Sequence, residues 1–400
     1  MRFLALSLCL AASLHAQSVV VVDASGGPDV DFLSLTEAVT NAPDGALVLV
    51  RSGTYLGFEV DAKTLTVASD EGAVVVVTSG CSVRNLQAGQ SCTLVGLDLT
   101  PPVTLPQPNL EVSDCDGGVW LERVVVASSM ANPFFASDSV LLQNSASVVM
   151  TNCRIEGSQG SLLGAAAGLA VLGSSVHAYG CTVQGVPPTA SGAPGSAGVR
   201  VFDGFLFAAD SQFTGGTGAL GGNFFGCEDG GDGGPGILMQ TPTAQALLYG
   251  TTLAGGAGGL LVGPGTCATG AVGPPSFILS GSLAETPLAP YRLDVPGPLR
   301  SGTPTQLTFT GTAGASAWLV YADAAATTFL PGLFGSLLLA PPFTILPVGT
   351  LDGTGSLSFP LRAPAVPAGA GSRSWRVQSL FLDLSGGFVL GSGAPLIVLR

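Results

Sequence analysis

Positive charge is the scarcest property of this 400-residue chain. It has 13 lysines and arginines, with Lys63 the only lysine, against 26 aspartates and glutamates, which gives a formal net charge of −13. Nucleic acids and anionic lipids are bound through basic surfaces, and such a chain has little with which to build one. We therefore expect neither as a partner.

Long apolar runs are missing after the first residues. Residues 1–16 have Arg2 near the start, an apolar run from Phe3 to Leu14, and Ala16 before Gln17, which is the layout of a secretory signal peptide. No later segment offers the roughly 20 consecutive apolar residues of a membrane-spanning helix. The sequence therefore predicts a cleaved signal peptide, no membrane span, and a protein that is secreted or held at the cell surface.

Helical periodicity is rare, whereas 58 residues are glycine and 28 are proline, a composition typical of short strands joined by tight turns. A repeat organises these strands. Residues 168–185 align without a gap with 198–215, and with 236–255 after two extra residues. Each copy ends in a five-residue pattern with a small residue first, an apolar residue third and glycine fifth. The small residues are Cys153, Cys181, Ser211 and Thr251.

The repeat contains period-2 strands, so each copy is one turn of a β-coil, and successive coils stack in parallel about 4.8 Å apart. Equivalent side chains then form columns, and Cys181, Ser211 and Thr251 are successive steps of one interior column. The sequence predicts an all-β fold built on a parallel β-helix. Such a stack exposes apolar interior at its end and needs a lid.

A short amphipathic helix precedes the first coil and is suited to be that lid. Phe32, Leu35, Val39 and Ala42 share one helical face, and Ser34-Leu35-Thr36-Glu37 is a capping-box pattern. We expect a helix over 34–42.

This helix, the following Ala-Pro-Asp-Gly, an apolar strand and Ser-Gly-Thr-Tyr resemble the start of right-handed parallel β-helix proteins of the pectin-lyase-like superfamily. The resemblance covers roughly residues 19–280 and implies a right-handed parallel β-helix with a short N-terminal capping helix. It implies no particular activity.

Beyond about Glu285 the repeat gives way to alternating strands such as TQLTFTG and GSLSFPL, which predict a smaller antiparallel β-sandwich. This piece resembles the modules that end many large secreted proteins of planctomycete-type bacteria. We divide the chain into a signal peptide (1–16), a parallel β-helix (17–280), a linker (281–290) and a β-sandwich (291–400).

Enzymes of the superfamily carry their catalytic groups on the outer face of adjacent coils. The polygalacturonase set fails because no Arg-x-Lys exists, and the sole histidine after residue 16, His177, aligns with Phe207 and Leu247 in an apolar column. The esterase set is incomplete as well. Its candidates, Arg200, Asp203 and Asp210, occupy one coil, but glycines stand at the equivalent positions of the preceding coil. Hydrolysis needs two carboxylates at a defined separation, so we predict surface charges here and no catalytic residue.

The nearest candidates for a lyase-type calcium site are Glu228, Asp229 and Asp232, in CEDGGDGG. Their spacing matches no complete calcium-loop consensus, and we predict no cofactor. They lie in the middle of three insertions, 186–197, 216–235 and 256 to about 274, which leave the coil at one equivalent turn. We expect these to lie side by side along one flank, either as irregular loops or as a stacked face that contacts a ligand.

Seven cysteines remain after the signal peptide, an odd number in a compartment that permits disulfides. Cys227 with Cys267 is the favoured disulfide, because the two lie in adjacent long insertions, and Cys81 with Cys92 is the second. Cys153 and Cys181 stack in neighbouring coils about 4.8 Å apart, beyond disulfide range. We expect free buried thiols there, with Cys181 and His177 both pointing inward.

No catalytic set is complete, so the leading hypothesis is a secreted, non-catalytic β-helix protein for surface attachment or for glycan or protein binding. Its partner would be a polysaccharide or a cell-surface molecule. Two alternatives stay open: a polysaccharide lyase or glycoside hydrolase acting on polyuronates, and a structural component of the cell envelope. The sequence does not fix the oligomeric state.

Overall fold

The computed structural model describes residues 17–100, 107–128, 137–158, 166–221, 229–261 and 267–400. The predicted signal peptide lies outside them. Within them, helix α1 (Leu35–Asn41) is N-capped by Ser34, whose side chain accepts the N–H of Glu37, and its C-cap is Ala42. The expected capping helix is therefore confirmed, and no helix among these residues is long and apolar enough to cross a membrane.

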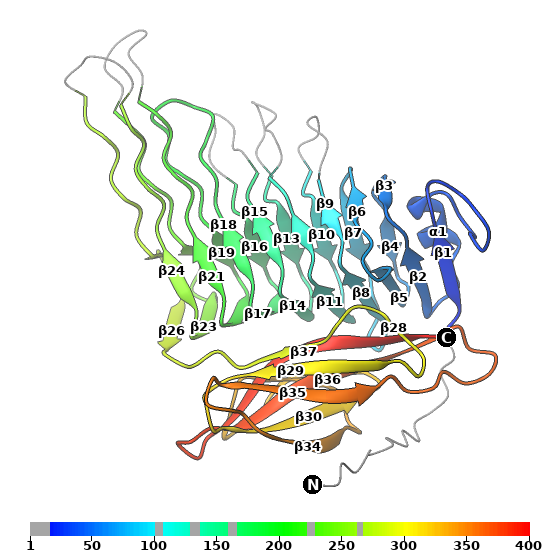
Figure 1. Ribbon diagram of the computed structural model, residues 1–400. Coiled ribbons are helices and arrows are strands. Elements are labelled where there is room, and N and C mark those ends of the chain that lie inside the picture. Colours follow the sequence, from blue (N-terminus) through cyan, green and yellow to red (C-terminus); the bar gives the residue numbers. More distant parts are fainter. Residues whose placement is uncertain (1–16, 101–106, 129–136, 159–165, 222–228, 262–266) are drawn as a thin grey trace.

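Three parallel sheets wind along the chain (Figure 1). The ten-stranded sheet contains, in order, β1 (Val19–Val22), β2 (Ala46–Val50), β5 (Leu65–Ser69), β8 (Ser91–Val95), β11 (Gly118–Glu122), β14 (Ser147–Thr151), β17 (Ser175–Tyr179), β20 (Phe205–Ala209), β23 (Gln245–Tyr249) and β26 (Ser282–Thr286). The second sheet contains β4 (Glu59–Asp61), β7 (Cys81–Arg84), β10 (Leu110–Ser113), β13 (Val140–Gln143), β16 (Leu169–Leu172), β19 (Val199–Phe202), β22 (Ile237–Met239) and β25 (Ser276–Ile278). The third contains β3 (Gly53–Tyr55), β6 (Val75–Val77), β9 (Asp98–Leu99), β12 (Val125–Val126), β15 (Arg154–Glu156), β18 (Thr182–Gln184), β21 (Gln212–Thr214) and β24 (Thr252–Ala254).

The predicted interior column is present at the corner between the ten-stranded and third sheets. Cys181 and Ser211 are buried, and the backbone N–H of Cys181 donates to Oγ of Ser211 across one coil at 3.1 Å. Thr251 continues the column half-buried, with its hydroxyl donating to the Ala208 carbonyl at 3.1 Å. Small polar residues are suited to this corner because each can bond the backbone of the coil before it.

The C-terminal residues form the expected β-sandwich. One sheet contains β27 (Arg292–Asp294), β29 (Pro304–Thr310) and β35 (Ser356–Arg362). The other contains β28 (Leu299–Arg300), β37 (Phe388–Leu399), β36 (Ser372–Leu382), β30 (Ser316–Ala322) and β34 (Thr344–Thr350), with β32 (Leu333–Phe334) on β37. A hairpin of β31 (Ala325–Phe329) and β33 (Ser336–Leu339) completes the domain. Most pairings are antiparallel, and the domain has its own core.

The predicted linker, 281–290, is too long. Strand β26 within it pairs in parallel with β23 as the last strand of the ten-stranded sheet. Residues 282–286 form one more coil strand. The sequence repeat does not identify it, because the glycine that ends each earlier copy is missing after it.

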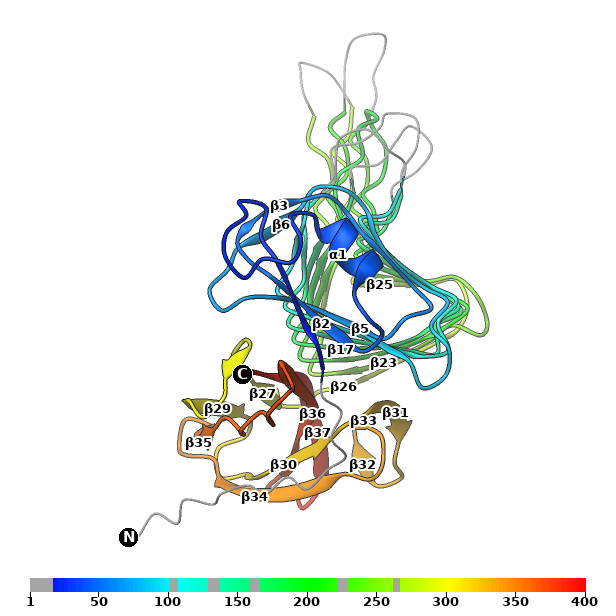
Figure 2. The same ribbon diagram turned by 90° about the vertical axis from the view of Figure 1, so that its right-hand side faces the viewer.

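The sandwich packs against the outer face of the ten-stranded sheet, as Figures 1 and 2 show from two sides. A cluster of buried residues joins the two domains: Trp120, Val149, Tyr179, Phe207 and Leu338. A second joins Leu47, Leu49, Ala68 and Val95 to Ile397 and Leu399. Strands of this sheet are apolar on both faces because both faces are buried, one by the coil interior and one by the sandwich.

Candidate functional site

The predicted catalytic candidates do not converge on one site. Arg200 pairs with Asp138 at 2.5 Å on the outside of the second sheet, and burial raises the pKa of the Asp138 carboxyl despite this arginine. Asp210 instead holds Arg292 of the sandwich. Both arginines are thus engaged with carboxylates on different parts of the surface.

Asp203 and Asp210 stand at successive corners of one coil because of their backbone conformation. Their φ values are 57° and 49°, in the left-handed region, and Gly173 and Gly180 occupy the same corners of the preceding coil with φ of 58° and 62°. Glycine, asparagine and aspartate tolerate this conformation best. The local geometry therefore accounts for these aspartates without a catalytic role.

The candidate metal residues also have structural partners. Oδ1 of Asp229 accepts the backbone N–H of Ala268, and Oδ1 of Asp232 accepts that of Ala271, both at 2.7 Å. Glu228 lies outside the described residues. Among the described residues, no group of three or more histidine, cysteine, aspartate or glutamate side chains could hold a metal ion.

The three insertions lie side by side, as expected, but they are regular rather than irregular. Their described segments, 186–197, 215–221, 229–236, 255–261 and 268–275, form what we call the glycine bundle, which projects away from the sandwich (Figure 2). The backbone N–H groups of Gly215, Gly218 and Gly221 donate to the carbonyls of residues 254, 257 and 260. Those of Gly230, Gly233 and Gly236 donate to residues 268, 271 and 274.

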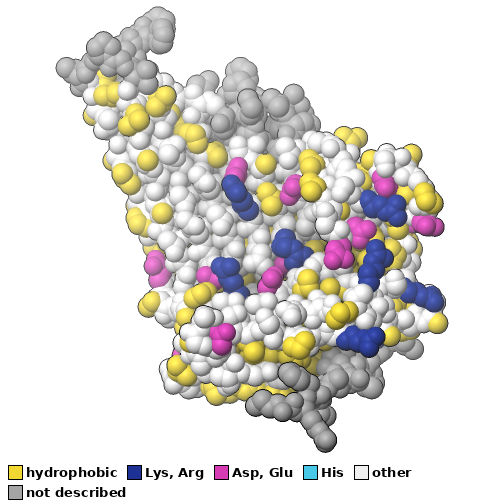
Figure 3. All heavy atoms as spheres, in the orientation of Figure 1, with side chains coloured by type: hydrophobic (Ala, Val, Ile, Leu, Met, Phe, Trp, Pro, Cys, Tyr) yellow, Lys and Arg dark blue, Asp and Glu magenta, His cyan; other side chains and the backbone are white. Residues whose placement is uncertain are grey.

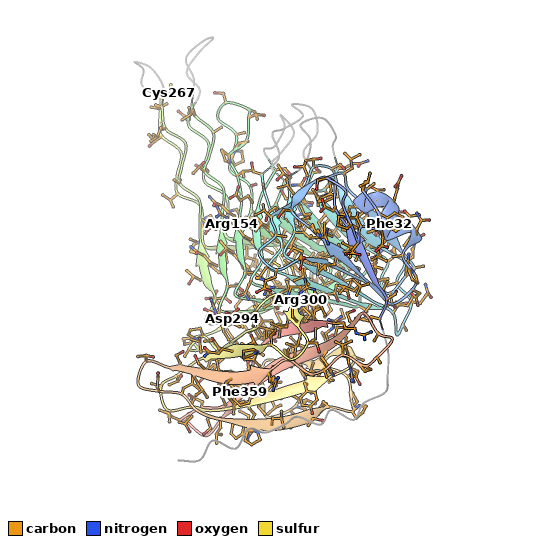
Figure 4. The ribbon with its side chains drawn as sticks, turned by 45° about the vertical axis from the view of Figure 1, so that its right-hand side comes forward. Phe32, Arg154, Cys267, Asp294, Arg300 and Phe359 are labelled. Atoms are coloured by element: carbon orange, nitrogen blue, oxygen red, sulfur yellow. The ribbon has the colours of Figure 1, made fainter. Side chains whose placement is uncertain are left out.

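This three-residue spacing matches polyproline II helices, which turn once every three residues and leave their backbone groups free for neighbours. A Cβ built on Gly218 would lie 1.8 Å from the carbonyl oxygen of Gly231. The chains therefore approach so closely that only glycine fits at the inward positions. Cys267 directly precedes the last segment of this bundle (Figure 4) and is disulfide-bonded; its predicted partner Cys227 lies outside the described residues, so that pairing stays a prediction.

The second predicted disulfide is wrong. Cys81 on β7 and Cys92 on β8 are both free, buried thiols on two different sheets that face the same interior. Cys153 and Cys181 are free and buried, as expected. Burial, reinforced by the adjoining Cys181, raises the pKa of the Cys153 thiol well above its usual range, which makes it a poor nucleophile.

The expected inward orientation of His177 is also wrong. Its register with Phe207 and Leu247 is confirmed, but this column lies on the outer face of the ten-stranded sheet. The sandwich buries it there, with Nδ1 2.9 Å from Oγ of Ser336. Burial lowers the pKa of His177 to about 4, so the ring is neutral and serves the domain interface.

A cleft at the domain junction is the candidate site that the sequence did not reveal. It has a volume of about 300 Å³ and lies between the first strands of the ten-stranded sheet and the sandwich. Its lining residues are Val19, Val21, Asp29, Leu49, Arg51, Asp70, Arg300, Gly371, Leu399 and Arg400. Arg300 stands where the two domains meet (Figure 4).

Three arginines converge on this cleft in a chain that has only 13 basic residues. Arg51 approaches Asp23 at 3.4 Å and Arg300 approaches Asp70 at 3.6 Å, which are long contacts for charged pairs. Arg300 and Arg400 lie together at the ends of the paired strands β28 and β37 of the sandwich, and the docking of the sandwich brings them to Arg51 of the β-helix. No sequence pattern marks this convergence.

The fold and this cleft define a two-domain β-helix protein with a junctional site. Neither a family model nor a curated protein matches the chain. Among solved structures, the superoxide reductase (neelaredoxin) of Ignicoccus hospitalis is similar over 27% of this chain and 80% of its own, at 11% identity and a TM-score of 0.18. The enzymatically active domain of bacteriophage CBA120 tailspike protein 2 covers 97% of this chain and 77% of its own, at 10% identity and a TM-score of 0.22. Similarities this low carry no argument about function.

Proposed function

We propose that this chain is a secreted, non-catalytic binding protein of the pectin-lyase-like type, which holds an acidic glycan in the cleft at its domain junction. The observation that carries the proposal is the convergence of Arg51, Arg300 and Arg400 on one cleft of a strongly acidic protein. Guanidinium groups bind carboxylates in a bidentate, directional way.

The other lining residues suit a sugar that carries a carboxylate. Asp29 and Asp70 offer acceptors for sugar hydroxyl groups, and Leu49 and Leu399 offer an apolar wall for the C–H face of a ring. A uronic acid has all three features: a carboxylate, several hydroxyls and an apolar face. We therefore name an oligouronide as the ligand class.

A hydrolase acting on the same ligands is the second candidate, because two carboxylates, Asp29 and Asp70, line one cleft. The binding function is favoured over it because Asp70 is already directed at Arg300. In addition, the sequence candidates Asp210, Asp229 and Asp232 each hold a structural partner.

The test is calorimetric titration of the protein with oligogalacturonate and with alginate oligomers. Saturable binding is expected, weakened about tenfold or more in Arg300→Gln, because a charge-assisted bidentate contact is lost. Arg154→Gln is the matched control, since Arg154 is an exposed arginine paired with Glu156 away from the sandwich (Figure 4).

Absence of saturable binding, or equal binding by wild type and Arg300→Gln, would remove the proposal. The same mixtures are assayed for new reducing ends and unsaturated products. Turnover that gives new reducing ends without unsaturated products, and that Asp70→Asn abolishes, would establish the hydrolase in its place, whereas unsaturated products would establish a lyase.

A further inference from the structure

The two ends of the β-helix are built differently. At the first end, α1 covers the interior with Leu35, Ala38 and Val39, all buried, and β1 adds a strand to the sheet. At the other end the three sheets stop at β24, β25 and β26, with no further strand on them in the described part of the chain. Figure 1 shows this open end on the left, opposite the blue cap.

The interior columns of the stack run out into solvent at the open end. Met239 on β22 is fully buried in the core, but Ile278, its register partner on β25, is 45% exposed. Leu248 on β23 is buried, and its partner Glu285 on β26 is exposed. The last coil therefore has the side chains of an interior layer without a layer above it.

Charge is almost absent from this end of the stack. Between Asp232 and Arg292, Glu285 is the only charged residue. Large exposed apolar side chains belong to the same last coil and its insertion: Leu260, Val272, Phe277, Ile278 and Leu279. On the face that Figure 3 shows, the left side of the β-helix has mostly hydrophobic and uncharged atoms with an acidic side chain at its edge, while the basic side chains lie farther to the right. Native edge strands are usually protected by charges or coverage, and this edge has one carboxylate for three strands.

We propose that the open end, defined by β24, β25, β26 and the described residues 255–261 and 267–275, is a docking surface for the same end of a second copy of this chain. The free edges of β24, β25 and β26 surround the interior of the last coil, and each edge presents backbone N–H and carbonyl groups. A partner that satisfies all three at once needs three edges in the same arrangement, and a second copy has them. This proposal does not depend on the glycan site.

The contact is isologous, so a two-fold axis relates the copies and the strands of the two ends meet in antiparallel pairs, with β26 against β26. Growth stops at two copies because the first end of each chain is closed by α1. The arrangement predicts a dimer with its two N-terminal caps facing outward and not a filament.

The experiment is sedimentation velocity over a micromolar concentration series, with a dimer expected for the wild type. Ile278→Lys raises the dissociation constant about a hundredfold or more, because the interface would enclose an unpaired ammonium ion. Glu285→Leu lowers it, because the one carboxylate is removed. Leu56→Lys is the control at an exposed leucine near the capped end, 68% exposed against 45% for Ile278, and leaves the dimer intact.

A wild-type monomer throughout the series overturns the proposal, and so does a dimer that survives Ile278→Lys. If Ile278→Lys fails to fold, Ala284→Cys on β26 decides the matter. Under mild oxidation, the Ala284→Cys protein forms a covalent dimer if the open ends meet, whereas the Leu56→Cys protein does not. An Ala284→Cys protein that stays monomeric also overturns the proposal.

Discussion

Phe207 lies where the two domains meet, and truncating it measures how firmly the sandwich is docked. The ring is fully buried. Its centroid lies 5.4 Å from that of Tyr179, 5.3 Å from that of Tyr249 and 5.9 Å from that of Phe329, which belongs to the sandwich. If the outer face of the sheet were open to water, this side chain would contribute little to stability.

The expected cost of Phe207→Ala follows from its burial. An aromatic side chain buries about 150–250 Å², worth about 4–6 kcal/mol at about 25 cal/mol per Å². Measured Phe→Ala changes in cores cost about 3–5 kcal/mol, and we expect a value in that range. Phe202 lies on the same coil but is 45% exposed, so Phe202→Ala is the matched control at about 1–2 kcal/mol.

Urea denaturation, followed by near-ultraviolet circular dichroism, gives the free energy of unfolding for both variants. The informative quantity is the difference between the two free energies of unfolding, because each variant removes one phenyl ring from the same coil. Equal costs for the two substitutions would refute the docked arrangement, since Phe207 would then be no more buried than Phe202.

Three further predictions concern the bundle, the interface and the thiols. Gly218→Ala forces a Cβ against a carbonyl and speeds amide hydrogen exchange of the glycine bundle, whereas Gly353→Ala, with open space at its Cβ, does not. Burial raises the pKa of the Glu122 carboxyl to about 8, so between about pH 4.5 and pH 8 this group is protonated in the folded state and ionised in the unfolded state. The free energy of unfolding therefore falls as the pH rises through that range. Glu122→Gln removes this pH dependence, which thermal melts at a series of pH values measure. Residues 17–400 contain seven cysteines, so a Cys227–Cys267 bond leaves five thiols in that part of the chain. Thiol titration of residues 17–400 in denaturant without reductant counts them, and seven thiols would contradict the bond.

The features that the sequence predicted are those that repeat from coil to coil. Cys181, Ser211 and Thr251 recur at fixed spacing because the stack imposes the same backbone corner on each coil. That recurrence alone is enough to infer parallel pairing and an interior column. The capping helix was predictable for a similar reason, because Ser34 and Glu37 form a local capping pattern that needs no tertiary context.

The errors arise where distant segments meet. His177 belongs to an apolar column, but an apolar column on a sheet buried on both faces does not reveal which face it occupies. The glycine bundle escaped prediction because a spacing of three matches neither the helical nor the strand period. Arg51 and Arg300 are separated by most of the chain, and their meeting depends on how one domain docks on the other.

Strand β37 crosses the ten-stranded sheet, and this crossing limits where coils can be added to the β-helix. Leu399 packs near β2, and the carbonyl of Gly393 accepts the Thr151 hydroxyl on β14 at 3.0 Å. Six residues of strand span about 20 Å, and the four steps from β2 to β14 span about 19 Å. The length of this part of β37 therefore matches the distance across the strands from β2 to β14. A coil duplicated beneath it would put every later contact out of phase, whereas a coil appended after β26 would not.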